Sequence, residues 1–216
     1  MSPYFASAWI LLLSQAVWAL NVTSYADDTF ADLVTGHHIQ YTPAHAWKAV
    51  NNGNCTNCVS RPIASIAYNR TWHESDLSAS SQGVTPKATF SFVGESIFVY
   101  CIVQQLGPDL SASSYMHFVL DGNHTSDFIM LPTINDEPSY VPVAVYVNTS
   151  MPMGNHTLEI FNGIPGKSHA SVLLLDYIVY INFKLDAFDD KNNRHLYRSE
   201  LYNPDTQCHE SVGSDD

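Results

Sequence analysis

Positively charged side chains are scarce in this chain of 216 residues, which has 9 Lys and Arg against 21 Asp and Glu. The resulting formal net charge of −12 excludes a nucleic-acid groove and an anionic membrane surface as natural partners. Charged residues of both signs make up only 14% of the chain, against 45% hydrophobic residues, which is a globular composition. One domain of ordinary size is therefore expected.

Long apolar runs are also scarce. Residues 1–19 carry no charged side chain and contain a short apolar core, Trp9–Leu13, followed by small residues before a cut after Ala19. These features predict a secretory signal peptide. The best later run, residues 172–181, is shorter than the ~20 residues of a membrane span and contains Asp176. With its polar C-terminus, the chain is expected to be secreted and to keep no transmembrane segment after signal cleavage.

Six Asn-x-Ser/Thr sequons support the same route. They lie at Asn21, Asn54, Asn69, Asn123, Asn148 and Asn155. This number exceeds what the composition would give by chance, so the sequence predicts an N-glycosylated extracellular protein.

Sustained helical periodicity is absent from residues 20–183, where short runs rich in Val, Ile, Phe, Tyr and Thr alternate with turn residues. Residues 88–92 and 97–103 meet at a Gly-x turn, and Asp121-Gly122 joins two further strands. Several strands at this spacing predict an all-β fold, a two-sheet β-sandwich over residues 20–183. Residues 184–216 are richer in charge and predict a polar, acidic, flexible tail.

The stretch from Ala44 to Ser81 looks like a long loop, and long loops on sandwiches are where binding usually resides. Sugar-binding sites stack Tyr and Trp rings on pyranose faces and hold the hydroxyl groups with polar side chains. The candidates for ligand contact in this stretch are Trp47, Tyr68, Trp72, His73 and Glu74. For the two tryptophans, packing in the core is the alternative.

Cysteine is rare, with four residues: Cys55, Cys58, Cys101 and Cys208. In a secreted chain the Cys55-Thr-Asn-Cys58 spacing predicts a local disulfide, with a metal or redox site as the alternative. Cys101 lies in an apolar strand, where a thiol behaves as a small hydrophobic side chain. The pairing of Cys101 and Cys208 is left open.

Catalytic motifs are missing as well. The chain has no Gly-x-Ser-x-Gly, and no spacing selects two of its carboxylates as a glycosidase pair. We therefore expect no enzymatic activity.

Metal-binding patterns are weak. His37 and His38 are adjacent and would point to opposite faces of a strand, so they do not favour one shared ion. His45, His73 and the histidines of the two Gly-Asn-His-Thr stretches, His124 and His156, are expected to be turn and surface residues. Asp28 and Asp176 are candidates for a structural calcium ion between the terminal strands, with ordinary hydrogen-bonded carboxylates as the alternative. No other cofactor is expected.

An ordered series of motifs carries a resemblance to known proteins. The series comprises Asp27-Asp28-Thr29, Trp47, Cys55-x-x-Cys58, Thr71-Trp72-His73-Glu74, the stretch from Ala88 to Tyr100, Phe118-Val-Leu-Asp-Gly122, Gly154-Asn-His-Thr-Leu158 and Leu175-Asp-Tyr-Ile-Val-Tyr180. It spans about residues 26–182 and resembles the extracellular galactose-binding-like module of a large group of mushroom-type fungal secreted and single-pass membrane proteins. The resemblance implies a jelly-roll β-sandwich. It implies no catalytic residues, and a sugar-binding role would follow from fold analogy alone.

The sequence thus predicts a secreted, non-enzymatic β-sandwich that binds glycans or cell-wall components at the cell surface or wall. A structural or protein-interaction module without sugar binding is the first alternative. A weak glycan-directed hydrolase is the second. The sequence leaves the ligand and the oligomeric state open.

Overall fold

The computed structural model describes residues 19–77, 85–167 and 169–185. Twelve strands and three short 3-10 turns make up this described part. They are β1 (Ala19–Asp27), β2 (Gln40–Thr42), η1 (Ala44–Ala46), β3 (Trp47–Asn51), η2 (Ala64–Ile66), η3 (Tyr68–Arg70), β4 (Thr71–Leu77), β5 (Lys87–Gly94), β6 (Ser96–Gly107), β7 (Ser114–Leu120), β8 (Asn123–Met130), β9 (Thr133–Ile134), β10 (Ser139–Asn148), β11 (Gly154–Asn162) and β12 (Ser171–Leu185).

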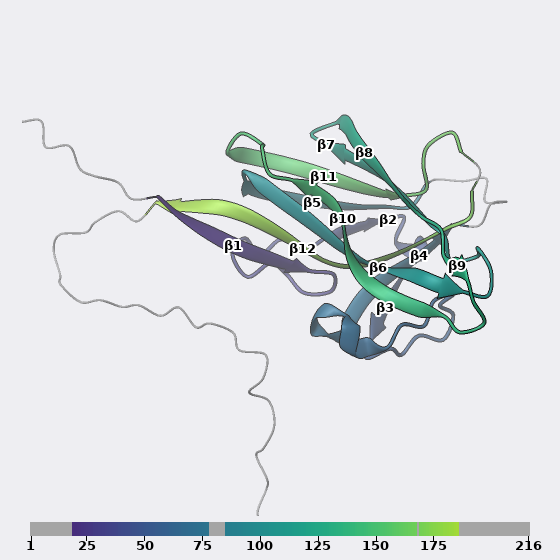
Figure 1. Cartoon of the computed structure of the whole chain (residues 1–216). Helices are drawn as coiled ribbons and strands as arrows, with labels where there is room; N and C mark the ends of the chain where they lie inside the picture. The colour runs from purple at the N-terminus through teal and green to yellow at the C-terminus, as the bar shows by residue number, and fades with distance from the viewer. Residues whose placement is uncertain (1–18, 78–84, 168, 186–216) are drawn as a thin grey trace, which may run out of the picture. The chain divides into compact units, whose positions relative to one another are not determined.

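These strands form the two packed sheets of a β-sandwich (Figure 1). The first, sheet A, has the order β10-β6-β12-β4-β3, with β1 beside β12 and β9 beside β6. The second, sheet B, has the order β2-β5-β11-β7-β8. The predicted fold class is confirmed.

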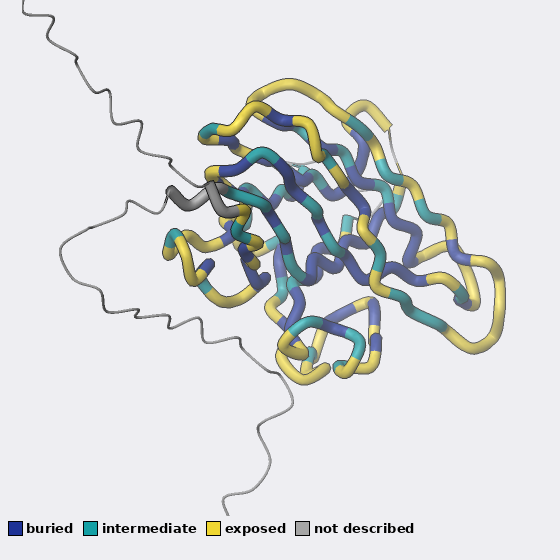
Figure 2. Tube along the Cα trace, turned by 60° about the vertical axis from the view of Figure 1, so that its left-hand side comes forward, coloured by how far each residue is buried: buried dark blue, intermediate teal, exposed yellow. Residues whose placement is uncertain are grey.

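The main core lies between the sheets. Alternation along β5 buries Ala88, Phe90 and Phe92, while the facing strand β6 buries Ile97 and Val99. Burying an aliphatic or aromatic side chain of this size stabilises the fold by about 1.5–3 kcal/mol. Figure 2 shows the result, with buried residues along the strands and exposed ones at the turns.

A second, smaller core covers part of the outer face of sheet A. The connection between β3 and β4, residues 52–70, folds over this face and closes on Trp72, Ile102 and Leu174. The stretch from Ala44 to Ser81 is therefore not one long loop, because it contains β3 and β4 as well. Hydrophobic periodicity did not predict β4, because this strand buries polar residues along with its tryptophan.

The Asp121-Gly122 turn forms the β7–β8 hairpin that the sequence predicts, with φ of 51° and 78° at the two turn residues. The Gly94-Glu95 turn is also present, but it leads from sheet B into sheet A. Strands β5 and β6 therefore lie in different sheets and do not pair with each other.

Strand β1 pairs with β12 from Ala19 opposite Leu185 to Asp27 opposite Tyr177, so strand pairing extends slightly beyond the predicted limits of residues 20–183. Residues 1–18 of the predicted signal peptide, residues 186–216 of the predicted tail and Cys208 lie outside the described residues. In the described part, no helix has the length and apolar character to cross a membrane.

Candidate functional site

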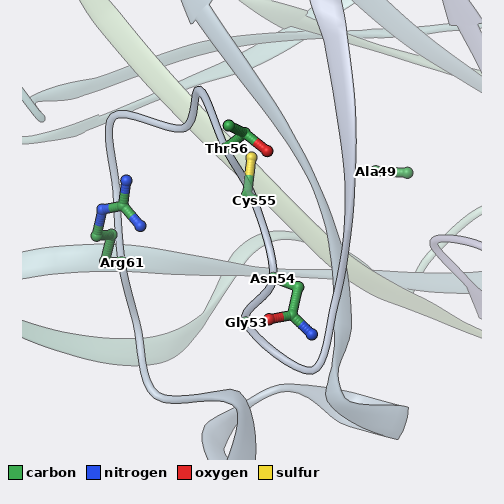
Figure 3. A pocket seen from close by; sticks show the side chains of 6 residues that line it. All are labelled: Ala49, Gly53, Asn54, Cys55, Thr56 and Arg61. Carbon is green, nitrogen blue, oxygen red and sulfur yellow. The ribbon is translucent and has the colours of Figure 1, made fainter.

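The β3–β4 connection carries an open hollow of about 470 Å³. Figure 3 shows the side chains around it: Ala49, Gly53, Asn54, Cys55, Thr56 and Arg61. An amide, a hydroxyl and a guanidinium group supply hydrogen-bonding capacity there. The lining contains no carboxylate and no imidazole, and among the described residues the Arg61 guanidinium has no ion-pair partner.

The loop around the hollow is held at two points. Cys55 and Cys58 form the predicted disulfide, with their Cα atoms 5.6 Å apart. The carboxylate of Glu74 accepts hydrogen bonds from the backbone N–H groups of Val59 (2.7 Å) and Ser60 (3.1 Å). These contacts fix the loop against β4, so the groups that line the hollow are positioned before any ligand arrives.

Glu74 itself is fully buried and not available to a ligand, contrary to the sequence-based expectation. Burial raises the pKa of Glu74, while the two backbone hydrogen bonds and the Lys48 ammonium, 3.6 Å from Oε1, act in the opposite direction. A buried carboxylate needs such partners because desolvation penalises its charge. Its role here is to support the loop.

Trp47 and Trp72 are core residues, with 8% and 1% of their surfaces exposed. Trp47 packs between the sheets beside Tyr41, and Trp72 lies under the β3–β4 connection. The structure thus favours core packing over a sugar platform for both rings, since neither face is open to solvent.

His73 is also engaged within the protein. Its Nδ1 lies 2.7 Å from Oδ2 of Asp28, and its ring stacks on Tyr41 at 4.0 Å between centroids. Thr71 donates a further hydrogen bond to the other oxygen of Asp28. His73 is therefore part of an internal polar network and not the ligand contact that the sequence suggested.

Tyr68 is the candidate that lies at the surface, half-buried in a cluster of four tyrosines on the outer face of sheet A. Its ring centroid lies 5.9 Å from that of Tyr25 and 5.0 Å from that of Tyr177, and Tyr177 stacks on Tyr100 at 4.5 Å. Burial and the neighbouring tyrosines raise the pKa of Tyr177 to about 12. The other three tyrosines, Tyr25, Tyr100 and Tyr177, were not predicted from the sequence. They come from β1, β6 and β12, and only the strand register brings these strands together.

Asp28 and Asp176 do lie near each other, as the calcium hypothesis requires, since the Asp28 N–H donates to the Asp176 carbonyl at 3.1 Å. The Asp176 side chain is fully buried and accepts a hydrogen bond from the Tyr68 N–H. Burial raises the pKa of Asp176 to about 8, aided by the charges of Asp28 and Asp27. Asp28 already accepts hydrogen bonds from threonine hydroxyls at both oxygens. Calcium binding here stays a prediction.

In the part of the chain that the structure describes, one group of three metal-ligating side chains converges, with its ligand atoms within 4.8 Å of one another. It consists of His117, His124 and Asp127, on β7 and β8. The sequence predicts a turn or surface residue at His124 and does not single out His117. The predicted hairpin could have revealed the pair, because its antiparallel register places His117 opposite Asp127.

No protein-family description and no curated protein sequence matches the chain. Among solved structures, the Agl-KA catalytic domain matches with a TM-score of 0.43 and 9% identity over 82% of this chain. The chain spans only 30% of the length of that structure. A family 35 carbohydrate-binding module from Clostridium thermocellum matches with a TM-score of 0.40 and 10% identity, covering 73% of this chain and 96% of the module.

The CBM36-1 domain of a multidomain xylanase from the hindgut metagenome of Trinervitermes trinervoides is a further neighbour. It has a TM-score of 0.33 and 12% identity, covering 65% of this chain and 98% of that domain. The structural neighbours thus include carbohydrate-binding modules.

Proposed function

We propose that this protein is a secreted, N-glycosylated and non-enzymatic β-sandwich that binds glycans at the cell surface or wall through the hollow in the β3–β4 connection. The observation that supports this proposal is the pre-positioned set of Asn54, Thr56 and Arg61 around an open hollow. Such amide, hydroxyl and guanidinium groups match the hydroxyl-rich surface of a saccharide.

Arg61 also favours a particular kind of saccharide. Its guanidinium forms no ion pair with another described residue, while a planar guanidinium pairs well with a carboxylate through two parallel hydrogen bonds. A glycan that carries a uronic acid should therefore bind more tightly than its neutral counterpart.

The same lining supports binding without hydrolysis. Glycoside hydrolysis ordinarily needs two carboxyl groups about 5–10 Å apart on either side of the scissile bond. The hollow has no Asp or Glu in its lining, and Glu74 is buried below the loop with its oxygens hydrogen-bonded.

Asn54 lines the hollow and is also the asparagine of a sequon. A glycan attached to Asn54 would cover the hollow and compete with an external ligand. Binding is therefore best measured on wild-type protein produced without N-glycosylation, because Thr56→Ala would remove a lining hydroxyl and enzymatic removal of the glycan would convert Asn54 to Asp.

The test is isothermal titration of the protein produced without N-glycans, with neutral and uronic-acid oligosaccharides as ligands. Arg61→Ala should weaken uronate binding by about tenfold, the loss of one charge-assisted contact of ~1.4 kcal/mol. Lys167→Ala removes an exposed positive charge that does not line the hollow, from the turn between β11 and β12, and should leave binding unchanged. Absence of binding to every saccharide, or equal losses in the two variants, would contradict the proposal.

Secretion and N-glycosylation can be tested by the mass of the secreted protein. Five of the six sequon asparagines are exposed and Asn148 is half-buried, so each has its side chain at the surface. The secreted protein should lose mass on enzymatic deglycosylation. An unchanged mass would show that this part of the proposal is wrong.

A second candidate is a protein-interaction module, which the loop before β2 favours. Phe30, Leu33 and Val34 are all exposed there, Leu33 almost completely at 97%. The loop is ordered by Asp32, which is buried and accepts hydrogen bonds from the Val34 and Thr35 backbone and from the Tyr180 hydroxyl. If this surface pairs two copies of the chain, Leu33→Asp should convert a dimer to a monomer in sedimentation velocity.

A further inference from the structure

Two imidazole rings and one carboxylate meet on the β7–β8 hairpin. This hairpin lies at one edge of sheet B (Figure 1). Nδ1 of His117 lies 2.6 Å from Oδ1 of Asp127, and Nε2 of His124 lies 3.1 Å from the same oxygen. We propose that His117, His124 and Asp127 form a binding site for a divalent transition-metal cation of the Zn²⁺ type. This inference is independent of the glycan-binding hollow.

The backbone explains why the three groups meet. His117 is directly opposite Asp127 in the antiparallel register, and a register shift at Phe118/Val119 places His124 opposite Val119. All three side chains therefore lie on the outward face, while Met116 and Phe118 point into the core. The site is built from strand positions, which hold ligands more firmly than a free loop does.

Aromatic contacts place the two imidazole rings side by side. The imidazoles of His117 and His124 are stacked with centroids 4.4 Å apart and planes only 5° from parallel. Phe161 of β11 packs edge-on against His117 at 5.8 Å. The Lys87 ammonium, the nearest cation from the neighbouring strands, is paired with Glu159 and lies over the Phe161 ring.

Asp127 suits the role of an anionic ligand. Its Oδ1 faces one nitrogen of each imidazole ring, at 2.6 Å from His117 and 3.1 Å from His124. The side chains remain accessible, with His124 52% and Asp127 34% exposed. A hydrated cation can therefore reach the ligand atoms from solvent.

The donor set selects the class of metal. Imidazole nitrogens suit Zn²⁺, Cu²⁺ and Ni²⁺, whereas Ca²⁺ and Mg²⁺ prefer an all-oxygen environment. Zinc is held at ~2.0–2.2 Å by such ligands and in the plane of each imidazole, so the two stacked rings would have to turn until both nitrogens and the carboxylate face the ion. Three protein ligands leave a coordination position for water or an external ligand.

A bound cation would tie β8 to β7. Because β8 forms the edge of sheet B, it pairs with only one strand in that sheet. An ion that binds the folded hairpin and not the unfolded chain stabilises the folded protein by mass action. Zn²⁺ should therefore raise the melting temperature in a concentration-dependent way.

The test uses the full secreted chain without a polyhistidine tag, titrated with Zn²⁺ by isothermal calorimetry and followed by thermal unfolding. His124→Ala removes one ligand but leaves the Asn123 sequon intact, and Asp127→Asn keeps the size of the side chain. Loss of outer partners alone typically weakens metal sites 10–100-fold, so each variant should bind at least about tenfold more weakly. His38→Ala removes an exposed histidine outside the site and is the matched control.

The result that supports the site is one Zn²⁺ per chain, with losses in His124→Ala and Asp127→Asn and none in His38→Ala. Electron paramagnetic resonance of the Cu²⁺ complex should show two coupled nitrogens in wild type and one in His124→Ala. The proposal fails if no cation binds, or if His38→Ala loses as much affinity as His124→Ala. Far-UV circular dichroism verifies that each variant is folded, which is expected because His124 is at the surface.

Discussion

Nδ1 of His156 lies 2.7 Å from Oδ2 of Asp121, and this pair connects the β7–β8 turn with the start of β11. The other ring nitrogen, Nε2, lies 2.8 Å from the carbonyl oxygen of Pro152. Both neighbours are acceptors, so the imidazolium form, with two N–H donors, satisfies both contacts. Burial lowers the pKa of His156, but these hydrogen bonds together raise it by a larger amount. The pKa of His156 therefore lies above its ordinary value.

This relationship predicts a pH-dependent contribution to stability. Burial raises the pKa of Asp121, but the contacts with His156 and the Thr157 N–H together outweigh it and lower the pKa. A lowered Asp pKa stabilises the fold above the unfolded value, and a raised His pKa stabilises it below about 6.5, so the pair contributes most between about pH 4 and 6.5.

His156→Gln should therefore reduce the free energy of unfolding more at pH 5.5 than at pH 8.5. The difference should be about 0.5–1 kcal/mol, because Asp121 is exposed enough for solvent to screen the pair. Urea denaturation at the two pH values measures it, with His38→Gln as the control. Equal losses at both pH values would show that the charge of His156 does not matter.

Asp176 predicts a second loss of stability with rising pH, at a buried carboxyl group. Its pKa of about 8 in the folded chain exceeds the ~3.9 of an unfolded Asp, so the folded state keeps a proton that the unfolded state releases. The free energy of unfolding should fall as pH rises from about 4 to about 8. Asp176→Asn cannot ionise, so it should flatten this slope and be more favourable relative to wild type at pH 8 than at pH 4.

The same variant tests the calcium hypothesis. If calcium is bound near Asp28 and Asp176, chelation should lower the melting temperature of wild type, and Asp176→Asn should remove that response. An unchanged melting temperature on chelation would exclude a structural calcium ion there.

Glu74 is expected to be important for the loop and not for contact with a ligand. Glu74→Ala would leave the Val59 and Ser60 N–H groups without their acceptor and remove the ion pair with Lys48, at a cost of about 2–4 kcal/mol. Glu74→Gln keeps an acceptor and should cost less. Limited proteolysis within residues 52–70 should be faster in the alanine variant, and equal stability of both variants would contradict this role.

Gly94 is required by its surroundings. A Cβ atom at this position would lie 2.6 Å from the carbonyl oxygen of Ile181, which is backbone and has little freedom to move. Gly94→Ala should therefore destabilise the chain by about 1–3 kcal/mol through overpacking. Glu95→Ala, at the next position, leaves the backbone hydrogen bonds unchanged and should cost less in thermal unfolding.

Much of the fold followed from local pattern. Short β-rich runs and turn residues predicted the sandwich, and Asp121-Gly122 predicted a hairpin because its geometry depends on neighbouring residues alone. The Cys55–Cys58 disulfide was predictable for the same reason. Strand β4 was missed because its buried Glu74 and Ser75 are satisfied by partners from other segments, which periodicity does not detect.

The sequence by itself determined the composition, the all-β class, the local disulfide and which side chains are able to bind a ligand or a metal ion. Only the tertiary structure decided their roles: it buried Trp47, Trp72 and Glu74, bound His73 to Asp28, and left Arg61 at an open hollow. It also brought His117, His124 and Asp127 together through strand register. The physical reason is that burial and pairing depend on contacts between segments far apart in the chain, whereas turns and disulfides of short span depend on adjacent residues.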